Sequence, residues 1–231
     1  MTREFVIVFG AKKNTLIPNV DSKTIYSANS AVVIGSKYKE KFRNTKHICV
    51  VPAKAYYKID EIKKAVRESK PDVILSRFGK INYNDLNNFI PNLIEIENFS
   101  NFDQLKFQSK FIKYGILNVL FSELYYKKKF FNKTKHLIQC LTWRNFMGCS
   151  TGVYCILKAA YDNPNSNILI SGISLEGGPY FQGSRNMTEG RAEVDKYFLK
   201  HISDDIKSRL FTLDKEMSMV TGIKVWDGET L

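Results

Sequence analysis

The chain has 231 residues, of which 44% are hydrophobic and 13% aromatic, so it can bury a core and is not a disordered protein. Its net charge of +12 favours an anionic partner, such as a nucleotide, nucleic acid, anionic lipid or acidic glycan, although a lysine-rich genomic composition would give the same excess. Because no apolar run reaches the ~18 residues of a membrane span and no signal-peptide pattern opens the chain, we expect one cytoplasmic domain over residues 1–231.

Two apolar runs near the N-terminus predict strands. Phe5–Phe9 is followed by Gly10, the usual opening of a nucleotide-binding α/β fold, but the absence of GxGxxG means that a dinucleotide is not indicated. Thr24–Ser30 predicts the second strand, and Asn29 near its end offers a donor and an acceptor to a pyrimidine or a ribose. The alternatives are that Gly10 opens an ordinary parallel sheet and that Asn29 is a turn residue.

The next segments alternate between strand and helix patterns. His47–Pro52 and Asp72–Arg77 predict strands, and Lys58–Ser69 between them predicts a helix. This alternation indicates an α/β fold with a doubly wound, mainly parallel, Rossmann-like sheet. Arg77 either faces a phosphate or an acidic sugar or is a solvated loop arginine, and we favour the solvated arginine.

The middle of the chain, residues 83–146, is the least regular and could supply a small lid on the acceptor side. A strand is expected at Leu93–Ile96 and a helix at Leu105–Glu123. In Tyr125–Lys135, lysines lie between paired aromatic residues, a pattern that suits a membrane interface or single-stranded nucleic acid. A helix end with a core-facing aromatic side is the third interpretation.

The stretch from Ser150 to Gly178 predicts a loop, a helix, a turn, a strand and a loop. Ser150 and Thr151 can cap a helix that starts at Gly152 or Val153, and Asn167–Ile173 predicts a buried strand. In open α/β sheets, ligands collect at the carboxyl ends of strands and the amino ends of helices. Both kinds of end occur within this one stretch.

Two motifs here resemble the bacterial lipooligosaccharide sialyltransferases, whose Thr-Ser-Gly-Val-Tyr helix start precedes a Ser-Gly-Ile-Asp strand end. The matching residues are Ser150–Tyr154 (STGVY) and Ser171–Ser174 (SGIS). The resemblance implies a transferase that moves sialic acid, a related nonulosonate or Kdo from a CMP-sugar donor to a surface glycan or lipid-linked acceptor. The nucleotide-binding residues it implies are Gly10, Asn29, Ser150, Thr151, Gly152, Gly172, Ser174 and Tyr180.

No DxD-type pair stands at a strand end, so no metal is implied, and no cofactor is expected beside the CMP-sugar substrate. We expect the enzyme in the cytoplasm, and the Tyr125–Lys135 run together with a lipid-linked acceptor favours the inner face of an anionic membrane.

The chain departs from this family at two places. Ser174 stands where the family has its strand-end aspartate, and Arg191 stands near the place of the family's catalytic histidine, which none of the three histidines of this chain occupies. A guanidinium cannot accept a proton, although it can hold a carboxylate or phosphate. We therefore expect the base to be Glu176 or, second, Glu189, whereas Glu193 is expected near the start of a helix, where it favours the dipole. The alternative is that all three are solvated surface acids.

A second hypothesis comes from another class of protein. The missing histidine favours a catalytically degenerate nucleotide-binding or nucleic-acid-binding α/β protein, whereas the group of implied nucleotide-binding residues favours the transferase, for which nucleic acid is not an expected partner. The four cysteines show no CxxC spacing, and Cys49 and Cys155 lie in apolar segments. We expect these two to be buried thiols, with neither disulfides nor a metal site.

Overall fold

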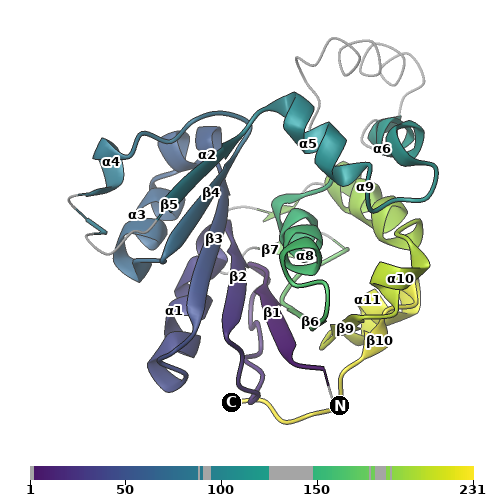
Figure 1. Ribbon diagram of the computed structural model, residues 1–231, viewed down its shortest axis with the longest axis horizontal. Helices are drawn as coiled ribbons and strands as arrows, with labels where there is room; N and C mark the ends of the chain where they lie inside the picture. Colours follow the sequence, from purple (N-terminus) through teal and green to yellow (C-terminus); the bar gives the residue numbers. More distant parts are fainter. Residues whose placement is uncertain are drawn as a thin grey trace.

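A single parallel sheet organises the chain. The structure is a computed structural model that describes residues 3–87, 89–90, 95–124, 148–176, 178–179, 186–187 and 189–231. In this part of the chain, eight parallel strands follow the order β10-β9-β6-β1-β2-β3-β4-β5 (Figure 1). They are β1 (Phe5–Phe9), β2 (Thr24–Ala28), β3 (Lys46–Pro52), β4 (Val73–Arg77), β5 (Glu95–Phe99), β6 (Asn167–Ser171), β9 (Leu210–Thr212) and β10 (Lys224–Val225). A separate antiparallel pair joins β7 (Gly178–Pro179) to β8 (Asn186–Met187).

The strand order confirms the predicted doubly wound, Rossmann-like sheet. From β1 the chain builds outward through β2 to β5 on one side, and through β6, β9 and β10 on the other. The order therefore reverses between β1 and β6, which makes their carboxyl ends the topological switch point. These ends are level, because Phe9 of β1 pairs with Ser171 of β6 and with Ser27 of β2.

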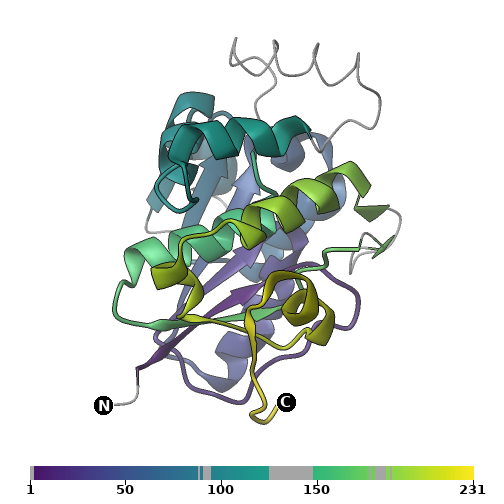
Figure 2. The ribbon, with the colours of Figure 1, turned by 90° about the vertical axis from the view of Figure 1, so that its right-hand side faces the viewer.

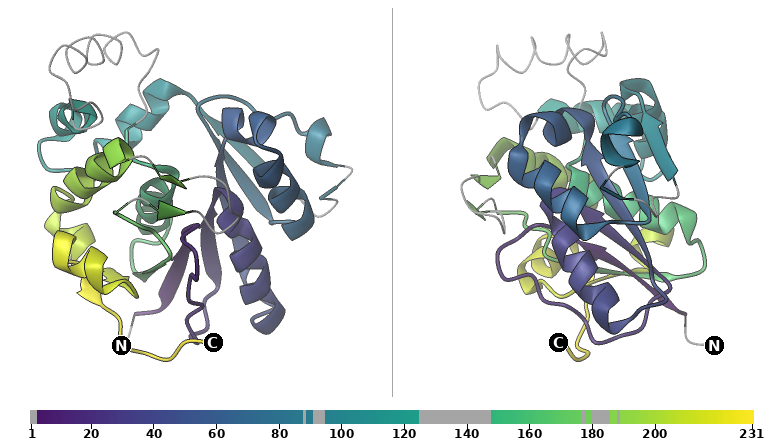
Figure 3. Two further views of the ribbon diagram at one scale, coloured as in Figure 1. Left: turned by 180° about the vertical axis from the view of Figure 1, so that it is seen from behind. Right: turned by 90° about the vertical axis from the view of Figure 1, so that its left-hand side faces the viewer.

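Helices cover both faces of the sheet. Helix α8 packs over the central strands on one face, and α1, α2 and α3 cover the other, as the view from behind shows (Figure 3). Figure 2 shows α9 running beside α8 on the first face. The helices are α1 (Val32–Lys41), α2 (Ala53–Lys58), α3 (Asp60–Ser69), α4 (Asn84–Asn87), α5 (Asn101–Gln108), α6 (Gly115–Glu123), α8 (Thr151–Asp162), α9 (Glu189–Lys200), α10 (Asp204–Lys207) and α11 (Lys215–Thr221).

The alternation of side chains along β1 explains this layering. Val6 and Val8 belong to the core cluster on the α8 side, whereas Ile7 and Phe9 point to the opposite face, where the ring of Phe9 lies 5.9 Å from that of Tyr38 in α1. Both faces of β1 are buried, as expected for a central parallel strand. Cys49 and Cys155 are free thiols within this core, which confirms their predicted burial.

The expected helix over Leu105–Glu123 is wrong as a single element. The chain forms α5 and α6 instead, interrupted at Tyr114 and Gly115, whose φ angles are +62° and +57°. Between the helices, Ile112 forms a β-bridge to Ile202. The predicted helix at Lys58–Ser69 is found as α3 from Asp60, with the separate α2 before it.

Part of the expected lid lies outside the described residues. The first half of the region 83–146 contains α4, β5, α5 and α6, whereas Tyr125–Lys135 and the residues up to 147 are not described. The lid and the membrane role of Tyr125–Lys135 therefore stay predictions. In the part of the chain that the structure describes, no helix combines the length and the apolar character needed to cross a bilayer.

Candidate functional site

Two glycines bring the carboxyl ends of β1 and β6 into contact. The Gly10 N–H donates to the Ser171 carbonyl at 2.7 Å, and the Lys12 N–H donates to the Gly172 carbonyl at 2.9 Å. A Cβ atom on Gly10 would overlap the Gly172 carbonyl, and Gly172 has a φ of +73°. Both predicted glycines therefore lie together at the switch point, and close backbone approach requires each of them.

The amino end of α8 lies beside this contact. A Cβ atom on Gly152, in the first turn of the helix, would lie 3.3 Å from the side chain of Ile173, which follows β6. The Ser150 hydroxyl accepts the Val153 N–H at 3.3 Å, which confirms the predicted N-cap. The positive end of the α8 dipole is thus directed to the loops that follow β1 and β6, where an anion would be stabilised.

Asn29 contributes an unused acceptor at the end of the neighbouring strand. It follows β2 directly and has a φ of +54°, a conformation that asparagine tolerates better than most residues. Its Oδ1 atom is buried and has no hydrogen-bond partner among the described residues. A buried amide oxygen without a donor is costly, so this atom is suited to accept a hydrogen bond from a ligand.

Buried side chains hold the short loop Gly148–Ser150 that leads into α8. The three backbone N–H groups of Gly148, Cys149 and Ser150 donate to the side chains of Glu123, Gln108 and Asp195, respectively. These acceptors come from α6, α5 and α9, and all three are fully buried. The loop is therefore fixed from three helices, which sets the direction of the α8 amino end.

Arg77 holds the same loop from the sheet, so its interpretation as a solvated loop arginine is wrong. It is the last residue of β4, is 1% exposed, and donates to the Cys149 carbonyl at 3.1 Å. It also donates to Gln104 Oε1 at 3.0 Å and to Thr151 Oγ1 at 3.4 Å. Its guanidinium lies 4.4 Å from the ring centre of Tyr154. Burial lowers the pKa of this guanidinium from its ordinary value.

Helix α9 brings Arg191 and Asp195 to the loop. Arg191 donates to the Gly148 carbonyl, and Asp195 Oδ1 accepts the Ser150 N–H at 2.7 Å. Burial raises the pKa of Asp195 to about 6, an effect that the hydrogen bonds from Ser150 and the charge of Arg191 partly offset. Asp195 Oδ2 has no hydrogen-bond partner among the described residues. This carboxyl group is therefore neutral at mildly acidic pH.

The expected catalytic acids lie around the site rather than in one described cluster. Ser174 and Glu176 are in the loop after β6, where the Ser174 hydroxyl accepts the Glu176 N–H at 3.3 Å and the Glu176 side chain is exposed. Glu189 begins α9, two residues before Arg191, and its side chain is outside the described part. Tyr180 also lies outside the described residues.

Neither described histidine is placed near Arg191. His47 is fully buried on β3, bonds Ser27 Oγ at 2.8 Å, and has its pKa lowered to about 3 by burial. His201 follows the far end of α9 and stacks on Tyr197. The third histidine, His136, is not described.

Sequence reasoning missed Asp195, Glu123, Gln104 and Gln108. For Asp195 a signal was present, because it shares the buried face of α9 with Ala192, Phe198 and Leu199, where a carboxylate is unexpected.

No set of three or more His, Cys, Asp or Glu side chains in the described ranges is arranged to hold a metal ion. No family model, curated protein or solved structure matches the chain.

Proposed function

We propose that this protein is a glycosyltransferase that moves sialic acid, a related nonulosonate or Kdo from a CMP-sugar to a surface glycan or lipid-linked acceptor. The observation that carries the proposal is the unpartnered, buried Oδ1 of Asn29 at the end of β2, beside the contact between Gly10 and Gly172. An amide oxygen in this place can accept a hydrogen bond from the exocyclic amino group of cytosine or from a ribose hydroxyl. The resemblance of Ser150–Tyr154 and Ser171–Ser174 to the sialyltransferases makes CMP the first nucleotide to consider.

The amino end of α8 would stabilise the phosphate of the CMP leaving group. Departure of CMP leaves an oxocarbenium-like sugar, so charge stabilisation at the phosphate lowers the barrier. The loop Gly148–Ser150 is held rigidly by its buried partners, so the α8 dipole needs little reorganisation when the donor binds. Arg191, beside this loop, would contact the carboxylate of the sugar or the phosphate.

Glu176 is our first candidate for the base that accepts the proton of the acceptor hydroxyl. It follows β6 at the switch point and is exposed, so an acceptor could reach it. Glu189 at the start of α9 is the second candidate. Arg191 cannot perform this step, because its guanidinium stays protonated at any working pH.

The test is CMP release from a panel of CMP-sialic acid, CMP-nonulosonate and CMP-Kdo, with and without galactose-terminated and lipid A acceptors. The proposal expects acceptor-dependent release from one donor of the panel. UDP-sugars serve as the control, because the base-reading amide should discriminate against uracil. Release from UDP-sugars alone would show that the donor class is wrong.

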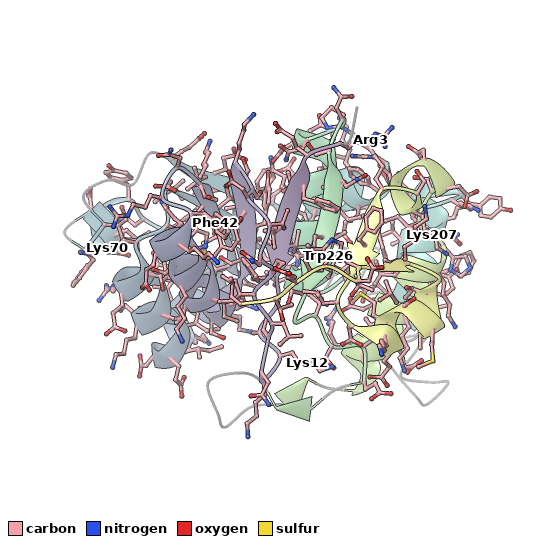
Figure 4. The ribbon with its side chains drawn as sticks, turned by 90° about the horizontal axis from the view of Figure 1, so that it is seen from below. Arg3, Lys12, Phe42, Lys70, Lys207 and Trp226 are labelled. Carbon is pink, nitrogen blue, oxygen red and sulfur yellow. The ribbon has the colours of Figure 1, made fainter. Side chains whose placement is uncertain are left out.

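A catalytically degenerate nucleotide-binding protein is the second candidate, favoured by Arg191 in the place of the catalytic histidine of the resembled family. It predicts thermal stabilisation by CMP without turnover of any donor. For its nucleic-acid-binding form, the four labelled basic residues Arg3, Lys12, Lys70 and Lys207 lie on separate sides of the molecule (Figure 4). Lys12 is also paired with Asp214 at 2.7 Å.

A further inference from the structure

Asp195 is a buried carboxylate at the amino end of α8, where an amide would make the same hydrogen bond. The residue is 0% exposed, and helix α9, which carries it, runs beside α8 (Figure 2). Its Oδ1 atom accepts the Ser150 N–H at 2.7 Å, whereas its Oδ2 atom has no hydrogen-bond partner among the described residues. An asparagine could accept the same hydrogen bond without the cost of burying a charge. The support of the loop before α8 therefore does not explain why this residue is acidic.

The carboxylate lies next to the groups that would bind the phosphate of the nucleotide. Ser150 is the N-cap of α8, and the N–H groups of Thr151 and Gly152, in the first turn, have no acceptor within the helix. Asp195 accepts the N–H directly before these two, so its charge stands at the same helix end as the proposed phosphate. Two negative charges there repel one another, and the repulsion is stronger in a buried site than in water. Because Asp195 is fully buried, it would act on the phosphate through this field and not by contact.

Four further ionisable groups lie around Asp195 or hold the same loop. Arg191 on α9 and Arg77 at the end of β4 bring positive charge, and both stay protonated between pH 5 and pH 8. Cys149 in the loop stays a neutral thiol, because burial raises its pKa to about 12. Glu123 of α6 accepts a backbone N–H of the loop. Burial raises the pKa of Asp195 itself to about 6, although hydrogen bonds and the two arginines lower it, so this carboxyl group changes its charge within that range.

We propose that Asp195 makes the nucleotide site select against the product CMP. In the donor, the phosphate is a diester with one negative charge, whereas in CMP it is a monoester whose second charge appears at about pH 6. The ionised carboxylate of Asp195 therefore repels the product more strongly than the donor and speeds its release at neutral pH. This inference rests on the proposed function, and it deepens that function by naming the residue that discriminates between donor and product.

The test is calorimetric titration of CMP and of its methyl ester, a phosphodiester as in the donor, into wild type and Asp195→Asn at pH 7.5. We expect the variant to bind the methyl ester about tenfold more tightly than wild type does, and CMP about a hundredfold more tightly, because the coupling acts once for each negative charge. Glu193→Gln is the matched control, since it removes an exposed carboxylate from the same helix. It should change the affinity for either ligand by less than about twofold, because solvent screens its charge.

Wild type gives a second measurement that needs no variant. The methyl ester keeps one negative charge between pH 5 and pH 8, so a change in its affinity over this range reports on the protein. Its affinity for wild type should fall about tenfold, mostly above pH 6, because the ionised form of Asp195 repels the ligand and the protonated form does not. Binding of the ester in turn raises the pKa of Asp195 above its value of about 6 in the free protein. In Asp195→Asn the affinity should be the same at pH 5 and at pH 8.

Any of three results would overturn the inference while the nucleotide site stands. Equal CMP affinity of wild type and Asp195→Asn at pH 7.5 would show that the carboxylate does not act on the phosphate. An equal gain for CMP and the methyl ester in the variant would show that Asp195 does not discriminate by charge. A wild-type affinity for the methyl ester that is independent of pH would contradict the inference without any variant. Absence of binding by all three proteins, each shown to be folded by its thermal midpoint, would instead refute the proposed nucleotide site, and the inference with it.

Discussion

Asp195→Asn should stabilise the protein at neutral pH, although it removes a carboxylate next to two arginines. In the folded state, burial raises the pKa of Asp195 from 3.8 to about 6. Between these values the folded state holds a proton that the unfolded state has released. The contribution of Asp195 to the free energy of unfolding therefore falls as the pH rises from 3.8, and it is lost in full above about pH 6. A difference of roughly two pKa units corresponds to about 3 kcal/mol.

The asparagine keeps the acceptor for the Ser150 N–H and stays neutral at every pH. The two proteins should therefore be nearly equal in stability at pH 4, and the variant should be more stable by about 3 kcal/mol at pH 7.5. Urea unfolding from pH 4 to pH 8 measures this difference, because contributions from all other groups cancel between the two proteins.

The control is Glu193→Gln, which removes one negative charge from an exposed position of the same helix and should change stability by less than about 0.5 kcal/mol. The opposite view is that the ionised Asp195 is stabilised in the folded state as the counterion of Arg191 and Arg77, so that its charge adds to stability. Removing one partner of such a buried pair costs about 3–5 kcal/mol. A loss of that size in Asp195→Asn at pH 7.5 would refute our reasoning.

Three further predictions concern the switch point and the chemistry proposed for it. Gly172→Ala should lower the free energy of unfolding by about 1–3 kcal/mol, measured in urea, because φ is +73° and the new methyl group would overlap the Thr15 hydroxyl. Glu176→Gln should reduce CMP release by roughly 10²–10⁴-fold while CMP still binds, and near-normal turnover would eliminate it as the base. Arg191→Lys should raise the KM for the donor about tenfold, because an ammonium cannot replace the two-point contact, and an unchanged KM would remove Arg191 from the donor site.

Elements with a strong local pattern could be predicted from the sequence. The β-branched runs of β1 and β6 are buried on both faces, and the cap of α8 by Ser150 is a local hydrogen bond to Val153. Helix α1 was not predicted, because its N-cap residue, Ala31, provides no side-chain cap before the helix begins at Val32. Its position depends on contacts distant in sequence, such as the hydrogen bond from the Tyr38 hydroxyl to the Val20 carbonyl.

The polar network around α8 could not be predicted for the same reason. The partners of Arg77 that lie in the loop before α8 and in its first turn are 72 and 74 residues away, so no local pattern distinguishes Arg77 from a solvated arginine. The places of Gly10 and Gly172 at the ends of two neighbouring strands could be predicted, because a strand followed by glycine is a local pattern, whereas their role in nucleotide binding stays a prediction. The link between α5 and α6 contains both the positive φ at Tyr114 and a bridge from Ile112 to Ile202, a contact between residues distant in sequence that no local pattern indicates.

The most direct test of the central claim is calorimetric titration of CMP into wild type and Asn29→Gly. Glycine adopts the φ of +54° found at this position, so the variant removes the amide and keeps the backbone. Lys70→Gly is the control, because it removes a side chain at another positive φ. Lys70 follows α3 and precedes β4, so it lies at the amino ends of the strands, opposite to the ends that hold Asn29. We predict that wild type and Lys70→Gly bind CMP equally, and that Asn29→Gly binds it about tenfold more weakly. Equal CMP affinity in all three proteins, or no CMP binding by wild type, would contradict a nucleotide site at the ends of β1, β2 and β6.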